Sequence, residues 1–483
     1  MNKRRSLLRK IRVFQGGMGV AVSGWQLARA VSIRGLLGIV SGTGLAIVLS
    51  RRLQNGDKDG MIHLALEHFP IPEMGWRIWN KYYIEGGKDP SEPFKAIPVI
   101  GHRPTGDAIA LLIVANFVEI WLAKRGHNGL IGVNYLEKLQ DPHLYSLFGA
   151  ILAGVDVVVV GAGLPTQFPG VIQRLSSFRE ATYNLSVVNG DLFPMKFDPC
   201  TVMDKRVFRK LKIQQPLFLG IVSTFLAAKI LHTRSNGPVD GFVVEKPIAG
   251  GHNAPPRNKT LSELGEPVYD MEGKDNPRLE EIIGLGLPVW VAGGTGSREV
   301  LQVVRKLGAA GIQVGTQFSL ALESGIPLET KQRRIKKIQA GTDVVRTDPR
   351  ASPSGYPFKV VDLEGTVSEE AVYEGRTRIC DLSYLREAYW MANGELGWRC
   401  PSEPVEDFVR KGGKEEETLG RKCICNHLLG LLQLGQIRRD GSTEPAIMTS
   451  GDDTSYFRSR KFCKKYGVPK AKRVIKDLLG TPK

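Results

Sequence analysis

Two glycine-rich segments of this 483-residue chain each follow a short apolar run directly. Residues 293–297 read GGTGS after PVWVA, and residues 315–317 read GTQ after IQV. Glycines let backbone N–H groups approach a phosphate closely, and a helix that starts there adds partial positive charge. Tight turns alone would also explain the glycines, but two such loops favour a phosphate site. The candidate phosphate-binding residues are Gly293, Gly294, Thr295, Gly315 and Thr316.

A histidine stands in a third such position. The run GFVVE at 241–245 is followed by KPIAGGHN, which places His252 directly after Gly250 and Gly251. Backbone at a Gly-Gly pair can crowd a ligand, so Gly251 is a candidate ligand contact. Imidazole titrates near neutral pH, and His252 is therefore a candidate general base. For the other histidines we expect surface or core roles: His63, His68, His102, His127, His143, His232 and His427.

Two further segments suit a flat ring. The first apolar run closes on QGGMG at 15–19, and another closes on Asn134. Gly17 would let a ring lie on the backbone, Met18 offers a soft apolar contact, and Asn134 can satisfy a polar ring edge. Turn glycines and a core methionine are the alternative interpretation. Together with the phosphate loops, these residues favour a planar heteroaromatic ligand with a phosphate tail.

The cysteines indicate neither a metal site nor a disulfide framework. The chain has six, mostly far apart, which favours a reducing compartment and a cytoplasmic location. Cys423 and Cys425 with His427 lack the spacing of a zinc motif, so we expect no metal.

Eight short apolar runs alternate with segments of helical length, which is the pattern of parallel strands joined by helices. Their number favours a closed (β/α)8 barrel, or TIM barrel, over an open sheet, and residues at the carboxyl ends of its strands would then form the site. The predicted strands are Val13–Gln15, Leu36–Val40, Leu130–Tyr135, Val155–Gly161, Leu217–Ser223, Gly241–Glu245, Val289–Ala292 and Ile312–Val314.

The predicted barrel occupies residues 12–325 and carries additions. An insertion follows the second strand at 51–128, and a mostly helical extension at 326–457 is expected to cap the barrel mouth. Basic tails are expected at residues 1–11 and 458–483. Additions at the mouth of a barrel commonly set access and specificity.

The formal net charge of +17 first suggests a polyanionic partner, but most of it lies at the two ends of the chain. No nucleic-acid-binding module is visible, so we expect solvated tails and no specific nucleic acid. The longest apolar run, 108–123, includes Asn116 and Glu119 and is shorter than the roughly 20 residues of a membrane span. We therefore expect no membrane span.

Three motifs together resemble the nitronate monooxygenase family, formerly called 2-nitropropane dioxygenases, whose relatives include flavin-dependent enoyl-acyl-carrier-protein reductases. The resemblance covers roughly 12–325, and NYLEK, ASPSGYPFKV and CICN beyond those motifs suggest a longer branch. The three motifs are QGGMG at 15–19, AGGH at 249–252 and AGGTGSREVLQVVRKLGAAGIQVGTQF at 292–318.

The resemblance implies FMN bound without a covalent link. Its phosphate would lie on Gly293, Gly294, Thr295, Gly315 and Thr316, and its isoalloxazine against Gly17, Met18 and Asn134. His252 matches the catalytic histidine of the family. The chain departs from the family pattern at Gly17, where Pro is common, and in the longer proline-rich loop after His252, which would reshape the substrate side.

The expected activity is oxidation of an alkyl nitronate with dioxygen, in which His252 orients the substrate or acts as a base. An NAD(P)H-dependent reductase of an enoyl thioester or quinone is an alternative in the same fold. A flavin-free isomerase or aldolase acting on a sugar phosphate is another, with Lys229 or Lys246 as a candidate Schiff-base residue.

Overall fold

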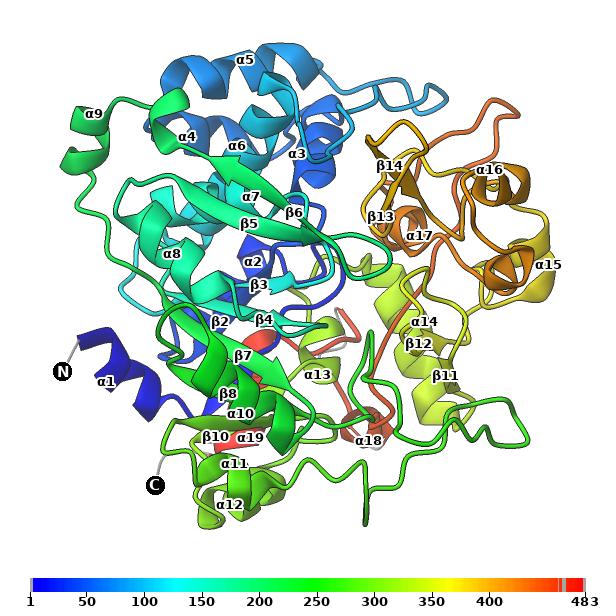
Figure 1. Ribbon diagram of the computed structural model, residues 1–483. Helices are drawn as coiled ribbons and strands as arrows, with labels where there is room; N and C mark the ends of the chain where they lie inside the picture. Colours follow the sequence, from blue (N-terminus) through cyan, green and yellow to red (C-terminus); the bar gives the residue numbers. More distant parts are fainter. Residues whose placement is uncertain (1–2, 459, 463–465, 481–483) are drawn as a thin grey trace.

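The computed structural model describes residues 3–458, 460–462 and 466–480. Eight parallel strands close into a barrel in the order β1-β10-β9-β8-β7-β4-β3-β2, which confirms the predicted fold (Figure 1). The strands are β1 (Val13–Gln15), β2 (Leu37–Ser41), β3 (Ile131–Leu136), β4 (Val157–Gly161), β7 (Leu217–Val222), β8 (Gly241–Glu245), β9 (Val289–Ala292) and β10 (Gly311–Val314).

The barrel interior is filled with side chains. Trp290 of β9 is fully buried and stacks on Phe14 of β1 with ring centroids 4.4 Å apart. Its indole Nε1 donates to the backbone oxygen of Ile11 at 2.9 Å. Aliphatic side chains surround the pair, among them Leu37, Ile39, Val157, Val159, Leu217, Leu219 and Val243. Because this interior is packed, a ligand site must lie at a mouth of the barrel.

Both basic ends fold onto the barrel, so the prediction of solvated tails is wrong for the described residues. Helix α1 (Lys3–Lys10) buries Leu8 in the cluster that contains Trp290, and Arg5 Nε lies 2.6 Å from Asp240 Oδ1. Helix α19 (Ala471–Leu479) packs against α2 (Trp25–Ser32), α12 (Arg298–Lys306) and α13 (Thr316–Ser319). Apolar residues at helical spacing among the lysines give each end one buried face.

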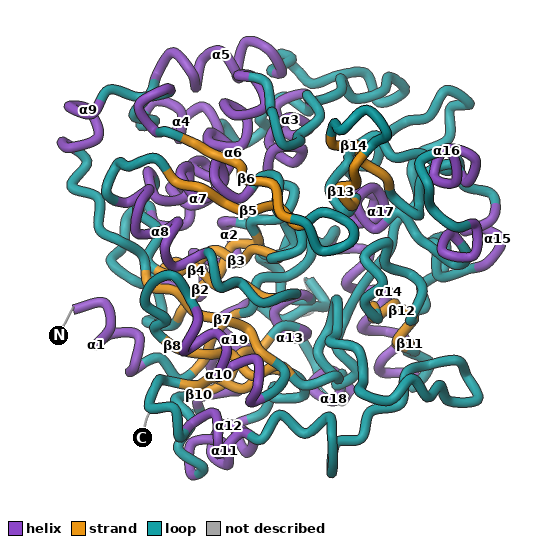
Figure 2. Tube along the Cα trace, viewed as in Figure 1, coloured by secondary structure: helices purple, strands orange, loops and turns teal. Residues whose placement is uncertain are grey.

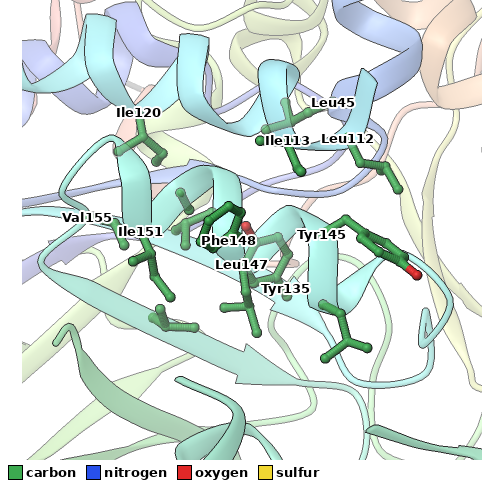
Figure 3. Packing of buried hydrophobic residues seen from close by; sticks show 14 of the residues in the cluster. Leu45, Leu112, Ile113, Ile120, Tyr135, Tyr145, Leu147, Phe148, Ile151 and Val155 are labelled. Atoms are coloured by element: carbon green, nitrogen blue, oxygen red, sulfur yellow. The ribbon is translucent and has the colours of Figure 1, made fainter. Parts of the chain in front are cut away.

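The insertion contains the helices α3 (Leu45–Gln54), α4 (Met61–Glu67), α5 (Pro72–Tyr82) and α6 (Gly106–Lys124). Among the described residues, α6 is the one helix whose length and composition would suit a membrane span. However, 78% of its most apolar window is buried in the protein, which is typical of a core helix. Figure 3 shows its residues Ile113 and Ile120 facing Phe148 and Ile151 of α7 (His143–Leu152).

The helices on the rest of the barrel are α8 (Phe168–Ser176), α10 (Phe225–Arg234) and α11 (Leu279–Ile283). An antiparallel hairpin that the sequence analysis does not predict separates the fourth barrel strand from the fifth. It consists of β5 (Ala181–Ser186) and β6 (Leu192–Phe197), followed by η1 (Pro199–Thr201) and α9 (Lys205–Lys210).

The C-terminal extension lies beside the barrel and contains long loops and two hairpins besides the predicted helices (Figures 1 and 2). Its hairpins are β11 (Val345–Asp348) with β12 (Phe358–Val361), and β13 (Glu387–Trp390) with β14 (Leu396–Arg399). Its helices are α14 (Leu328–Ala340), α15 (Glu370–Glu374), α16 (Val405–Arg410), η2 (Glu415–Thr418), α17 (Ile424–Leu431) and α18 (Ser455–Arg458).

Replacing Trp290 with Ala should lower the free energy of unfolding by about 3–5 kcal/mol, because it empties the centre of the barrel and removes a buried hydrogen bond. Chemical denaturation measures the loss. Trp390→Ala is the control, since Trp390 is 43% exposed, and it should cost less than about 1 kcal/mol. Equal losses in the two variants would contradict the packed interior as the source of stability.

Candidate active site

A cavity of about 240 Å³ lies at the carboxyl ends of the barrel strands, where the extension meets the barrel. Its lining contains every residue that the sequence analysis selects for the site. These are Gly17, Met18, Asn134, Gly251, His252, Gly293, Gly294, Thr295, Gly315 and Thr316. The fold therefore brings all ten together, while the role of each stays a prediction.

The loop after β9 has a backbone that requires glycine. Gly293 and Gly294 have φ angles of +90° and +65°, in the left-handed region that other residues rarely adopt. A Cβ on Gly294 would lie 2.3 Å from Cδ1 of Ile248, and one on Gly293 would lie 3.0 Å from the backbone oxygen of Lys246. Both positions therefore carry bare backbone, packed against the loop after β8 and within the cavity lining.

The loops after β9 and β10 are joined directly. The side-chain Nε2 of Gln317 donates to the backbone oxygen of Gly296 at 2.7 Å. A Cβ on Gly296 would lie 1.8 Å from that same Nε2, so glycine is required for the contact. Helix α12 begins just beyond, where Ser297 Oγ accepts from the N–H of Val300 at 3.2 Å. The two loops thus form one surface at the N-terminal end of α12.

The two threonines of this surface differ in what they can offer. Thr295 Oγ1 donates to the backbone oxygen of Gln313 at 2.7 Å, so this hydroxyl is committed to the barrel. Thr316 Oγ1 instead accepts from the N–H of Gly451 at 3.2 Å and keeps its own hydrogen. Thr316 is therefore the threonine whose side chain can donate to a phosphate oxygen.

Another part of the cavity lining suits a flat ring. A Cβ on Gly17 would lie 2.5 Å from Cβ of Asn134, so only glycine fits at this position. Asn134 Nδ2 donates to the backbone oxygen of Val159 at 3.2 Å, which fixes the amide and leaves Oδ1 as an acceptor. The N–H of Met18 donates a hydrogen bond to Ser23 Oγ at 3.0 Å. A bare backbone, a thioether and a fixed amide fit an isoalloxazine, and the joined loops fit its phosphate.

His252 lies in the lining of this cavity, and side chains of the extension hold it in place. Its Nε2 is 2.7 Å from Ser352 Oγ, and its ring packs edge-on against Phe358 with centroids 4.8 Å apart. Burial, together with the positive charge of Lys138, holds the pKa of His252 well below its usual range. The imidazole is therefore neutral at neutral pH.

Backbone contacts join the His252 loop to the extension. The N–H of Lys359 donates to Gly251 O and the N–H of Asn253 donates to Pro357 O, both at 2.9 Å. The N–H of Gly251 donates to Thr449 Oγ1 at 2.9 Å. The extension thus fixes the position of the candidate catalytic residue.

A larger cavity of about 740 Å³ adjoins the first. Ala162, Ile221, Glu245 and His252 line both, so they form the boundary between the two. The outer cavity also contains side chains of both charges, including Lys246, Arg257 and Asp275. It is large enough to serve as a vestibule for a substrate that reaches His252.

Glu245, the last residue of β8, is a lining residue that the sequence analysis does not select. Burial raises the pKa of its carboxyl group to about 7, so it changes charge near neutral pH. Its position directly before the KPIAGGH segment at the end of a barrel strand was a usable signal.

The extension supplies other lining residues that the sequence analysis does not select. Tyr384 Oη is buried and has no hydrogen-bond partner among the described residues, which suits contact with a ligand. Other lining residues from the extension are Cys425, Thr449, Ser450, Gly451 and Asp453. Four of them belong to the run TSGDD at 449–453, whose small and polar residues could have indicated a ligand contact in the sequence.

Within the described residues, no group of three or more His, Cys, Asp or Glu side chains is arranged to hold a metal ion. Cys423 is buried with its Sγ 3.8 Å from the backbone oxygen of Ile379, and Cys425 lines the inner cavity. Of the two candidate Schiff-base lysines, Lys246 lines the vestibule, whereas Lys229 lines neither cavity.

A curated relative matches part of the chain. It is the (3aS,4S,5R,7aS)-5-hydroxy-7a-methyl-1-oxo-octahydro-1H-indene-4-carboxyl-CoA dehydrogenase of Mycobacterium tuberculosis (strain ATCC 25618 / H37Rv), which is 25% identical over 244 residues. The match spans 50% of this chain and 62% of the length of that relative.

Solved structures align over nearly the whole chain at low identity. FabK from Thermotoga maritima is 16% identical with a TM-score of 0.47, covering 99% of this chain and 95% of its own. Nitroalkane oxidase from Streptomyces ansochromogenes is 14% identical with a TM-score of 0.44, covering 98% and 96%. At these scores neither likeness carries a conclusion about activity.

The model of the nitronate monooxygenase family matches residues 199–361, a region that contains His252, both glycine-rich loops and strand β12. This match confirms the resemblance drawn from the three motifs. Residues 199–361 of this chain are therefore similar to the nitronate monooxygenase family.

Proposed function

We propose that the chain is an FMN-dependent oxidoreductase. The observation that carries the proposal is the single cavity whose lining contains both the two joined glycine loops and the bare backbone at Gly17. A phosphate would accept hydrogen bonds from the loop amides and from the hydroxyl of Thr316, at the start of helix α12. When bound, FMN would supply the ring that takes up and releases electrons.

For the substrate, we propose an alkyl nitronate with dioxygen as the electron acceptor. The family match at residues 199–361 supports this choice. A nitronate carries negative charge on oxygen, and a neutral imidazole that holds one N–H can donate a hydrogen bond to such an oxygen. His252 would thus orient the substrate at the boundary between vestibule and inner cavity.

A coenzyme A thioester reduced with NAD(P)H is the second candidate. The vestibule of about 740 Å³ is far larger than a small nitronate needs, and Lys246 and Arg257 give it cations for an anionic carrier. The name of the mycobacterial relative also describes a CoA compound. In this reaction His252 would orient the thioester carbonyl.

Anaerobic mixing of the purified protein separates these candidates. Bleaching of the flavin absorption by a nitronate, with no bleaching by NADH or NADPH, supports the first. Bleaching by NAD(P)H alone, with reoxidation by an unsaturated CoA thioester, supports the second. A colourless protein that takes up no FMN would refute both and favour the flavin-free sugar-phosphate enzyme.

Replacing Gly294 with Leu should weaken FMN binding at least about tenfold, which corresponds to about 1.4 kcal/mol, because the new side chain collides with Ile248 and strains a left-handed backbone. Titration of the apoprotein by flavin fluorescence measures the dissociation constant. Gly106→Leu is the control, since a Cβ there meets nothing within 4 Å and its φ is ordinary. Unchanged FMN affinity in the Gly294 variant would contradict the phosphate site.

Replacing His252 with Ala should lower kcat about 100-fold while the protein keeps its flavin, because positioning and acid-base effects of this size are typical of such residues. Steady-state oxygen consumption with a nitronate measures turnover, and the absorption spectrum reports the bound flavin. His232→Ala, at an exposed position, should change neither. Full turnover in the His252 variant would remove this residue from the reaction.

A further inference from the structure

Two serine side chains connect His252 to a partly buried lysine, Lys138. Lys138 Nζ donates to Ser354 Oγ at 2.9 Å, Ser354 Oγ lies 2.8 Å from Ser352 Oγ, and Ser352 Oγ lies 2.7 Å from His252 Nε2. Lys138 follows strand β3 of the barrel, and both serines lie in the turn between β11 and β12 of the extension. The connection therefore exists only when the barrel and the extension are docked.

The hydrogen bonds of this chain have a direction. A lysine ammonium donates and cannot accept, so Ser354 Oγ accepts from Lys138 and turns its own hydrogen towards Ser352. Ser352 Oγ also receives the backbone N–H of Ser354 at 3.3 Å. Since its oxygen accepts, the hydroxyl of Ser352 donates to Nε2 of His252. The remaining hydrogen of the neutral imidazole must then sit on Nδ1.

Two contacts in the environment of Lys138 stabilise its ammonium form. Its Nζ lies 4.6 Å from the centre of the Tyr356 ring, and the face of such a ring attracts a cation. Among the described residues no carboxylate forms an ion pair with it. Burial holds the pKa of Lys138 well below its usual range, while the ring and the Ser354 hydroxyl stabilise the ammonium. In its ammonium form Lys138 acts on His252 with no carboxylate paired to it among the described residues.

We propose that Lys138, Ser354 and Ser352 fix His252 as the neutral imidazole with its proton on Nδ1, so that His252 donates a hydrogen bond to an oxygen anion of the substrate. This inference rests on the proposed oxidoreductase function and specifies how His252 serves it. The contact of His252 with Ser352 is made by Nε2, which leaves Nδ1 for a ligand, and the residue lines both cavities. The three partners are positioning residues, because they act through His252.

Lys138 is the charged group that lowers the pKa of His252. Other titratable and charged groups also line the two cavities around His252. On the inner cavity these groups are Glu245, Tyr384, Cys425 and Asp453, and on the vestibule they are Glu137, Lys246, Arg257, Tyr269, Asp275 and Tyr356.

Nitrogen-15 NMR of the wild-type protein labelled at histidine tests the tautomer without any substrate. At pH 7 we expect one neutral imidazole protonated on Nδ1 whose signals disappear in His252→Ala. If the signals lost in His252→Ala were instead those of an Nε2-protonated ring or of an imidazolium, the proposal would be overturned. Because no turnover is needed, this result is independent of whether a nitronate or a CoA thioester is the substrate.

The pH dependence of turnover tests the role of the lysine. Loss of the cation in Lys138→Met should raise the pKa of His252, so activity that needs the neutral ring should fall at a pH at least about one unit higher on the acid side. Ser354→Ala breaks the chain without removing the charge and should lower the Nδ1-protonated fraction. The proposal would be overturned if the acid side of the pH–activity profile were unchanged in Lys138→Met and the tautomer of His252 were unchanged in Ser354→Ala.

Lys88→Met is the matched control. Lys88 is also partly buried, its Nζ lies 4.7 Å from the centre of the Phe94 ring, and it lines neither cavity. It should leave both the pH profile and the imidazole signals unchanged. If neither candidate substrate turns over even in wild type, the proposed function fails, whereas the NMR signals still decide the tautomer.

Discussion

The pairing of the loop at 251–253 with residues 357–359 is the contact on which the site depends. Two backbone hydrogen bonds and the edge-on packing of His252 on Phe358 join a barrel loop to a strand of the extension. Without this pairing the loop after β8 would lose the partners of its buried backbone groups, and an unpaired buried polar group is costly. The extension is therefore part of the site.

The phosphate loops and the ring-binding residues of the inner cavity offer a ligand different contacts. At the loops, bare backbone and the hydroxyl of Thr316 supply donors, and no lysine or arginine is among the described lining residues. At the ring-binding residues, Gly17 and Asn134 approach so closely that a side chain on Gly17 would not fit. The charged side chains gather in the vestibule instead, where solvent can reach them. The formal charge of the chain thus says little about its ligand.

The sequence predicts the barrel well because each strand leaves a local signal, a short apolar run that ends in small or polar residues. The site residues chosen by that rule lie at the end of a strand, as Asn134 does in β3, or in the loop that follows one, as Gly294 and His252 do. Ser352, Ser354 and Tyr384 could not be placed, because only tertiary docking brings loops of the extension to the barrel mouth. The amphipathic pattern of α19 was present in the sequence, but its high charge suggested a solvated tail instead.

The order in which the cavity lining occurs along the chain has a consequence for biosynthesis. Strand β1 pairs with β10 and β2, and the lining runs from Gly16 to Asp453. A ribosome must therefore add residues up to β10 before the second edge of β1 is paired, and almost the whole polypeptide before the last lining segment arrives. Contacts so distant in sequence form slowly. Nascent chains thus expose unpaired strand edges for much of their synthesis, and chaperones that shield such edges would have the greatest effect during that interval.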